Sequence, residues 1–362
     1  MTTSANGRQP ARAAIIGYGL SGAVFHAPLI AATPGLTVAA IVTNDPARRQ
    51  QAAADFPTAA LLTTDELWQA SPPYDLVVVG APNNAHLSLG LAALDSGAAV
   101  VMDKPFALTV ADAQTLIDRS TAVGRPIVPY QSRRWDGDFQ TVRHLLATGW
   151  LGEAVRFESR YDRFRPAPRV GTWREAGDPA NGGGLLYDLG SHLIDQANQL
   201  FGVPSAVYAE LPVRRAGSQV DDDSFVALTY PNGVVAHLYA SQLARTPGPR
   251  FVVRGTAGTF VKYGMDPQED ALKSGLRPTP DQPDWGTEDA AQWGTLQTER
   301  DGLTFDGRIT TLPGTYQAFY AGIAAMLHAG APPPVLATDA LLTQRVIAAA
   351  QISAASGSVV QL

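Results

Sequence analysis

The chain contains no cysteine, which excludes a disulfide framework and any metal site built on thiolates. It has no apolar run long enough to cross a bilayer, and the stretch from Met1 to Arg12 is polar where a signal peptide needs an apolar core. None of its six histidines is paired as His-x-x-x-His, and no other metal-ligand spacing occurs. These absences predict a cytoplasmic protein that binds neither a membrane nor a metal.

Positive charge is also in short supply. The 27 lysines and arginines are outnumbered by 33 acidic residues, which gives a formal net charge of -6. We therefore expect no general attraction to nucleic acid or to anionic membranes. With 362 residues, 45% of them hydrophobic, the chain is longer than a single core usually serves. We predict two domains, over residues 1–131 and 132–362.

A glycine-rich turn follows the first predicted strand, over residues 13–16. The turn reads Gly17-Tyr18-Gly19-Leu20-Ser21-Gly22. Its glycines meet the demands of dinucleotide binding: a tight turn at Gly17, close approach of the backbone to a pyrophosphate at Gly19, and close helix packing at Gly22. A second strand over residues 36–43 arrives at the proper distance. We predict that residues 17–22 bind a dinucleotide.

The end of the second strand bears on which dinucleotide is bound. An NAD site places an acid there, whereas an NADP site lacks that acid and has a cation nearby. Here Thr43 and Asn44 end the strand, and Asp45 is displaced by two residues. Thr43 and Asn44 can donate hydrogen bonds to a 2′-phosphate and Arg48 can pair with it. We predict NADP, and NAD stays open because Asp45 can simply start a helix whose arginines are solvated.

Strand and helix patterns alternate through the first domain. Strands are predicted over residues 75–79, 98–102 and 126–130, with helices ending near residue 96 and spanning 109–123. Because parallel strands need crossover helices, this order predicts a doubly wound parallel sheet, the α/β Rossmann arrangement. The first helix contains Pro28, so we expect a turn through Phe25 and His26 and a helix that restarts with Pro28 in its first turn.

The carboxyl ends of the third and fourth strands carry further candidates. Pro82, Asn83 and His86 follow the third strand and are predicted to line the dinucleotide, although His86 is equally typical of an ordinary helix start. Lys104 lies just past the fourth strand, at the edge where open α/β sheets bind ligands. Pro105 fixes its own φ, disfavours helix at Lys104 and can be cis, so a stiff turn aims one amine at one place. A surface lysine before a turn proline is the alternative, against which the dinucleotide pattern argues.

The periodicity changes after residue 131. A cluster of cations and an aromatic ring, Gln131-Ser132-Arg133-Arg134-Trp135-Asp136, lies at a strand end and suits a polyhydroxylated ligand. Strands are then predicted over residues 154–162, 206–213, 224–229, 234–241, 251–254 and 259–263. Few helices separate the last four, which predicts an α+β domain with a large, mostly antiparallel open sheet. We expect residues 221–223 to form a solvated acidic turn and residues 264–296 a long irregular insertion.

One helix interrupts these strands, over residues 185–200. Glycines at positions 182–184 precede it and let the backbone come close to a ligand. Asp188 and His192 are four residues apart and share one face. A histidine beside a carboxylate can exchange a proton near neutral pH. A structural i,i+4 pair is the alternative, and we favour catalysis because a dinucleotide domain precedes it.

Taken together, these motifs resemble the glucose-fructose oxidoreductase, inositol dehydrogenase and MocA (Gfo/Idh/MocA) family of two-domain oxidoreductases. The resemblance covers essentially the whole chain and rests on residues 17–22, Ala81-Pro82-Asn83, Asp103-Lys104-Pro105, and Gly182-Gly183-Gly184 followed by Asp188-Leu189-Gly190-Ser191-His192. Residues 22–28, 133–136, 173–175 and 262–268 further resemble the NADP-dependent scyllo-inositol dehydrogenases.

The resemblance implies that Lys104, Asp188 and His192 form the catalytic group, with Arg133 in the substrate pocket. Asp103 stands where the family usually has a glutamate before the lysine. The resemblance also implies a homodimer or homotetramer that associates through the open face of the second sheet. We further predict that Lys104 and Gln131 contact the dinucleotide. Predicted substrate contacts are Lys104, Arg133, Asp162, Trp173, Asp188 and His192.

The predicted reaction interconverts a secondary alcohol and a ketone on a cyclitol or sugar, with hydride transfer to or from NADP. Either His192 or Lys104 is the immediate acid or base, and Asp188 orients them. Two other classes of protein stay open. An NAD-dependent glycosidase of the same fold would release a sugar without net cofactor reduction, and a non-catalytic dinucleotide sensor would bind the cofactor without turnover.

Overall fold

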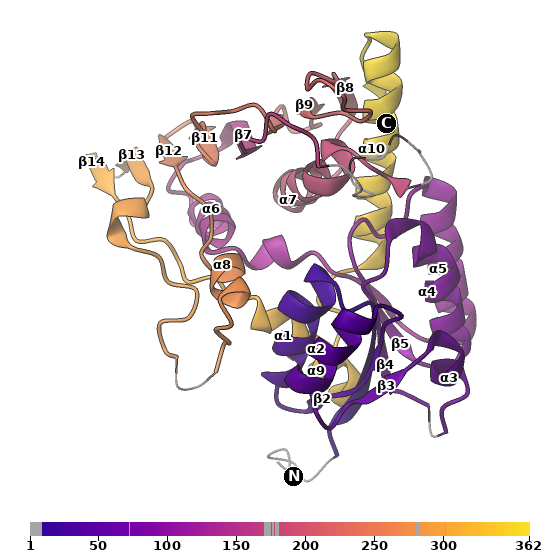
Figure 1. Ribbon diagram of the computed structural model, residues 1–362. Helices are drawn as coiled ribbons and strands as arrows, with labels where there is room; N and C mark the ends of the chain where they lie inside the picture. The colour runs from indigo at the N-terminus through magenta and orange to yellow at the C-terminus, as the bar shows by residue number, and fades with distance from the viewer. Residues whose placement is uncertain are drawn as a thin grey trace.

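The computed structural model describes residues 9–362 apart from 72, 170–174, 176, 178–180, 280–281 and 301. The chain forms two sheets with helices packed against them (Figure 1). No helix in the described part of the chain is long and apolar enough to span a bilayer.

The first sheet has six strands, all parallel, in the order β3-β2-β1-β4-β5-β6. Their bounds are β1 (Ala11–Ile16), β2 (Leu36–Val42), β3 (Ala60–Leu62), β4 (Leu76–Val79), β5 (Ala99–Met102) and β6 (Ile127–Pro129). Successive residues of a strand enter different cores: Ile15 packs on one side of the sheet and Ile16 on the other. Both faces are therefore covered, as the continuous apolar strands predicted, and the Rossmann prediction is confirmed.

Helices from distant parts of the chain cover the two faces. One face packs against α1 (Ala27–Ala31), α2 (Pro46–Asp55) and α9 (Gln317–Ala329), and the other against α3 (Thr64–Trp68), α4 (His86–Asp95) and α5 (Val110–Val123). Helix α9 thus returns from the end of the chain to the first sheet, beside α1 (Figure 1). The last helix, α10 (Ala337–Ser356), joins both domains, because Leu341 packs in a first-domain core and Ile347 in the second-domain core.

The expected turn through Phe25 and His26 is wrong. A π-helical segment, Ser21–His26, runs directly into α1, with Pro28 in the first turn of α1 as predicted. The N–H of Ala27 donates to the carbonyl of Gly22, five residues back. This wider spacing makes room before a proline that would collide with the carbonyl four residues earlier in an α-helix.

The second sheet has nine strands in the order β14-β13-β12-β11-β7-β10-β9-β8-β15, antiparallel except for the β7–β10 pair. Their bounds are β7 (Ala154–Asp162), β8 (Ala206–Glu210), β9 (Asp223–Thr229), β10 (Val235–Ser241), β11 (Phe251–Gly255), β12 (Gly258–Lys262), β13 (Thr295–Arg300), β14 (Leu303–Arg308) and β15 (Val360–Gln361). Helices α6 (Gly137–Ala147) and α7 (Ser191–Phe201) lie between this sheet and the first domain (Figure 1). The predicted α+β domain is confirmed; association through its open face stays a prediction.

The segment over residues 264–296 is less irregular than expected. It contains α8 (Gln268–Lys273), a 3₁₀ turn at Ala290–Gln292 and the start of β13. Leu272 of α8 is buried in a first-domain core. The segment is therefore anchored to the first domain, and α8 brings Glu269 and Lys273 to a cavity between the domains.

Candidate active site

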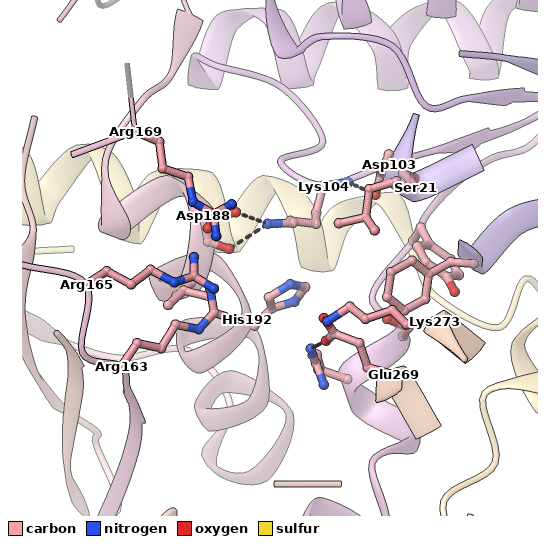
Figure 2. Close-up of a pocket in the computed structure, with 16 residues that line it drawn as sticks. Ser21, Asp103, Lys104, Arg163, Arg165, Arg169, Asp188, His192, Glu269 and Lys273 are labelled. Atoms are coloured by element: carbon pink, nitrogen blue, oxygen red, sulfur yellow. Dashed lines mark hydrogen bonds and ion pairs between the residues drawn. The ribbon is translucent and has the colours of Figure 1, made fainter. Parts of the chain in front are cut away.

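Two adjoining cavities lie at the carboxyl ends of the first-domain strands. One, of about 540 Å³, runs along the glycine turn, and the other, of about 430 Å³, faces the second domain. Both are lined by the same five residues at their junction: Leu20, Ser21, Asp103, Lys104 and Asp188. We call them the dinucleotide cavity and the substrate cavity, and Figure 2 shows the second.

The glycine turn is built as the sequence predicts. Gly17 has φ +96°, and a Cβ there would lie 2.4 Å from the carbonyl oxygen of Gly80. A Cβ at Gly22 would lie 2.1 Å from the carbonyl oxygen of Gly17, so this glycine permits the close packing of the helix on the turn. Gly17 and Gly19 line the dinucleotide cavity. A backbone this close to the cavity, without side chains, fits a pyrophosphate.

Tyr18 departs from its predicted role. Its side chain is buried in a first-domain core, and its hydroxyl donates to Asp55 Oδ2 at 2.8 Å. Tyr18 is therefore not among the side chains that line either cavity. Only its backbone belongs to the binding turn.

The predicted phosphate-binding group lines the dinucleotide cavity, with Thr43, Asn44 and Arg48 at its wall. The Arg48 guanidinium lies over the glycine turn, 3.5 Å from where a Cβ of Gly19 would be. Asp45 instead caps α2, since its Oδ1 accepts from Ala47 N at 2.9 Å and Arg48 N at 3.1 Å. Asp45 also lines this cavity, and its Oδ2 lies 3.7 Å from Arg48 Nε. The acid near this strand end therefore holds both the helix terminus and the Arg48 side chain, beside two further polar groups.

Asn83 and His86 serve different purposes. Asn83 lines the dinucleotide cavity with Pro82, and its Nδ2 donates to the carbonyl of Asn181 at 3.1 Å, across to the second domain. His86 is buried away from the cavity, contrary to prediction. Its ring nitrogens lie 2.8 Å from the carbonyl of Pro105 and 3.0 Å from that of Ala81. It therefore holds the loops after β4 and β5 in place without lining the cavity.

Lys104 lies where the two cavities meet. It follows β5, and its bond to Pro105 is cis. Its Nζ donates to the main-chain oxygen of Asp188 at 2.6 Å and to Asp188 Oδ1 at 2.8 Å. Asp103, which replaces the usual glutamate, accepts from the main-chain N of Lys104 at 2.8 Å, and its Oδ2 lies 3.9 Å from His26 Nε2. Asp103 thus fixes the backbone of Lys104, while Asp188 holds its amine.

His192, on α7, borders the substrate cavity close to Lys104 and Asp188 (Figure 2). Its Nδ1 lies 3.1 Å from Gln131 Oε1, so Nδ1 carries the proton of the neutral ring and Nε2 keeps its lone pair. Burial, together with the cations Lys104 and Arg133, holds the pKa of His192 well below its usual value. The ring is therefore neutral at neutral pH and suited to accept a proton. Gln131, predicted at the dinucleotide, instead contacts this histidine.

Of the three remaining residues predicted to contact the substrate, one lines the substrate cavity, one does not, and one lies outside the described residues. Arg133 lines the substrate cavity, donates to Tyr316 Oη at 2.9 Å and pairs with Glu269. Asp162 does not line the cavity, because at the end of β7 its Oδ2 accepts from Gly248 N at 2.8 Å. Trp173 lies outside the described residues.

The acidic run at residues 221–223 is not the solvated turn that we expected. Asp221 Oδ2 accepts from Leu186 N at 2.8 Å and from the hydroxyl of Ser224 at 2.7 Å. Asp222 is buried and pairs with Arg215 at 3.0 Å. Asp221 thus holds the start of the π-helical segment Leu186–Gly190, which carries Asp188 into α7.

Several cavity residues were missed at the level of sequence. Arg163, Arg165 and Arg169 follow β7, and Glu269 and Lys273 lie on α8. Three arginines within seven residues after a strand, at positions 163, 165 and 169, were a usable signal for the first group. The second group lay in the segment that we expected to be irregular.

Comparison with known proteins agrees with this geometry. Residues 11–129 match a family model described as an oxidoreductase family with an NAD-binding Rossmann fold, and residues 139–261 match the GFO/IDH/MocA C-terminal domain. The uncharacterized oxidoreductase YdgJ of Escherichia coli is 40% identical over 336 residues, which cover 93% of this chain and 94% of YdgJ. The chain belongs to the Gfo/Idh/MocA family. The resemblance inferred from the motifs is confirmed.

Other members of the Gfo/Idh/MocA family are similar over their whole length. The scyllo-inositol 2-dehydrogenase (NADP(+)) IolW of Bacillus subtilis is 35% identical over 339 residues, which cover 94% of this chain and 92% of IolW. The solved structure of yvaA from Bacillus subtilis superposes with a TM-score of 0.92 at 34% identity, covering 98% of this chain and 99% of that one. The protein is therefore an NAD(P)-binding oxidoreductase.

Proposed function

We propose that the protein is an NADP-dependent dehydrogenase that interconverts a secondary alcohol and a ketone on a cyclitol or sugar. The observation that carries the proposal is the position of Lys104. Its amine is held by Asp188 at the junction of the dinucleotide cavity and the substrate cavity. A substrate oxygen beside this amine lies next to both the cofactor site and His192.

The preference for NADP rests on the strand end after β2. Arg48, Thr43 and Asn44 line the cavity and can bind a 2′-phosphate, whereas Asp45 caps α2 through Oδ1 and pairs with Arg48 through Oδ2 at 3.7 Å. The name of IolW, a similar protein, includes NADP. Asp45 lines the same cavity, but its carboxylate is paired with Arg48 and with the helix terminus, whereas an NAD site needs a carboxylate that is free for the ribose hydroxyls.

Bound NADP supplies the hydride acceptor for oxidation and, when reduced, the hydride donor for reduction. The protein moves the accompanying proton. Neutral His192 accepts the hydroxyl proton at Nε2, and the Lys104 amine donates a hydrogen bond to the oxygen on which charge develops. Asp188 keeps that amine in place. If Lys104 is instead the immediate proton carrier, His192 positions the substrate oxygen.

The test follows the absorbance of the reduced cofactor. Loss of NADPH or of NADH is measured separately with inososes, keto-sugars and aldoses, and formation of each reduced cofactor is measured with inositols. We expect turnover with NADPH and a ketone of this panel. Turnover with NADH alone would refute the reading of Thr43, Asn44 and Arg48. Cofactor binding without turnover on the whole panel would refute the dehydrogenase.

A further inference from the structure

Three arginines form one wall of the substrate cavity. Arg163, Arg165 and Arg169 enter it from the segment after β7, opposite Glu269 and Lys273, with His192 between the two groups (Figure 2). The chain as a whole is acidic, with a formal net charge of -6. Basic residues outnumber acidic ones in the lining of this cavity, whereas acidic residues outnumber basic ones in the chain as a whole.

The backbone of this segment is fixed in an extended form. Arg163 N donates to the carbonyl of Ser241 at 2.9 Å, and Arg165 N to that of Gln242 at 2.7 Å. Phe164 forms a bridge with Leu243. Side chains alternate along extended backbone, so Arg163 and Arg165 share the cavity face, while Phe164 points away and stacks under Arg245, 4.1 Å from its ring centre. The guanidinium groups of Arg163 and Arg165 therefore project from a short extended segment whose backbone is fixed by hydrogen bonds.

Two carboxylates of the cavity, those of Asp188 and Glu269, are already paired with other cations. Asp188 pairs with Lys104 at 2.8 Å, and Glu269 pairs with Arg133 and, at 2.6 Å, with Lys273. Within the described residues, Arg163 and Arg165 have no ion pair of their own. Partial burial and the nearby cations Arg163 and Arg169 lower the pKa of Arg165, against a smaller opposing effect of Asp188 and Glu175. Cations held this close repel one another until an anion joins them.

We propose that the substrate carries an oxyanion, a carboxylate or a phosphate ester, which Arg163 and Arg165 bind while the reacting carbinol lies at Lys104 and His192. This inference rests on the proposed function and narrows its substrate class to anionic sugars or cyclitols. Guanidinium groups match both oxyanions, because their paired N–H donors form two parallel hydrogen bonds to two oxygens. The cavity is large enough for one sugar ring with a charged substituent, at about 430 Å³.

The test compares three matched ligands: D-glucose, D-glucuronate and D-glucose 6-phosphate. Their dissociation constants are measured by titration calorimetry with the full chain saturated with NADP, beside a turnover assay with each. We expect at least one charged sugar to bind about tenfold more tightly than glucose, because one charge-assisted hydrogen-bonded pair increases the affinity by about this factor. Which of the two charged sugars is preferred separates the carboxylate from the phosphate ester. The preference should shrink as salt is raised.

Two substitutions locate the effect. Arg165→Gln should abolish the preference for the charged sugar over glucose. Arg245→Gln is the matched control, because Arg245 lies beside the same segment but stacks on Phe164, away from the cavity. It should keep the preference.

The outcomes separate the two proposals. Equal binding of all three sugars, no binding of either charged sugar, or a preference that survives in Arg165→Gln would overturn the oxyanion site. If any of these results is found together with turnover of a neutral cyclitol, the oxyanion site is refuted but the proposed dehydrogenase activity is supported. A charged-sugar preference that Arg165→Gln removes supports the oxyanion site even where the turnover panel of the proposed function fails.

Discussion

Lys104 and Asp188 are joined twice: the Lys104 Nζ lies 2.6 Å from the main-chain oxygen of Asp188 and 2.8 Å from its Oδ1. Lys104 follows a strand of the first domain, and Asp188 lies in the π-helical segment that runs into α7 under the second sheet. The position of this amine therefore depends on both domains. A shift of α7 would move the amine away from the junction of the two cavities.

Replacing Lys104 by Ala should lower kcat by about two orders of magnitude or more, since it removes the amine that we propose acts on the substrate oxygen. The measurement is steady-state kinetics with the best substrate of the panel. Urea unfolding serves as the control for folding, because Lys104 also lines the dinucleotide cavity and its loss can weaken NADP binding. A variant with near-normal turnover would rule out the assigned role.

Replacing Arg48 by Gln should reduce kcat/KM for NADPH by about ten- to a hundredfold, the worth of a charge-assisted phosphate contact. The value for NADH should hardly change. Arg49→Gln is the matched control, because Arg49 Nη2 donates to the carbonyl of Leu61 at 2.7 Å and does not line the dinucleotide cavity. Equal losses of kcat/KM with NADPH and NADH would show that Arg48 does not contact the 2′-phosphate.

Two glycines with similar backbone angles allow the effect of backbone strain to be distinguished from that of steric crowding at the glycine turn. Gly17 has φ +96° and a Cβ there would lie 2.4 Å from a carbonyl oxygen, whereas Gly97 has φ +86° with nothing within 4 Å. Gly97→Ala should lower the free energy of unfolding by roughly 1–2 kcal/mol through backbone strain alone. Gly17→Ala should lower it further and weaken NADP binding by about tenfold or more, because the turn must shift. Urea unfolding and calorimetry measure both; equal effects of the two substitutions on NADP binding would contradict the crowding.

Much of the fold could be predicted because its signals are local. The glycine turn, the apolar strands of the first sheet and the alternating strands of the second each determine their structure within a few residues. Strands β13 and β14 were not predicted: β13 begins in the segment expected to be irregular, and β14 is exposed along most of its length and shows little apolar alternation. Helix α8 was missed because a six-residue helix between Pro267 and Gly275 has little sequence signal.

The site was predictable only in part, for a different reason. Lys104, Asp188 and His192 lie in motifs, but the partners that define their roles come from far along the chain: Gln131 for His192 and Asp188 for Lys104. His86 shows the converse, because its place after β4 suggested a ligand contact while its ring faces two carbonyls. Sequence position fixes which strand end a residue follows, and tertiary packing decides where its side chain points.

Replacing Arg134 by Met should lower the free energy of unfolding by about 3 kcal/mol, because it leaves a buried carboxylate without its cation. Arg134 is 8% exposed and pairs with Asp195, 3% exposed, at 2.6 Å, and with Asp339 of α10 at 3.0 Å. Arg119→Met is the control, since Arg119 and Asp95 are 44% and 51% exposed, and should cost less than about 1 kcal/mol. Urea unfolding of both variants decides the matter; similar losses would mean that the buried pair stabilises no more than a surface one.

The buried imidazole of His192 should make stability depend on pH in a defined direction. Burial, with Lys104 and Arg133 adding repulsion, lowers the pKa of His192 in the folded protein below the value of about 6.5 that it has in the unfolded chain. Between those two values the unfolded state binds more protons, so stability rises with pH there. The contribution is complete above about pH 6.5 and is lost as the pH falls below it.

His192→Gln should therefore lose less stability than the wild-type protein when the pH is lowered from 6.5 to 5.5. The difference in the free energy of unfolding should approach about 1.4 kcal/mol per pH unit at most, reduced because the ring borders a hydrated cavity. Urea unfolding at both pH values measures it. His144→Gln, a change of an exposed histidine on α6, is the control and should follow the wild-type curve. If the His192→Gln and wild-type curves run parallel, the imidazole is not held neutral by the fold, and its role as the base loses its physical support.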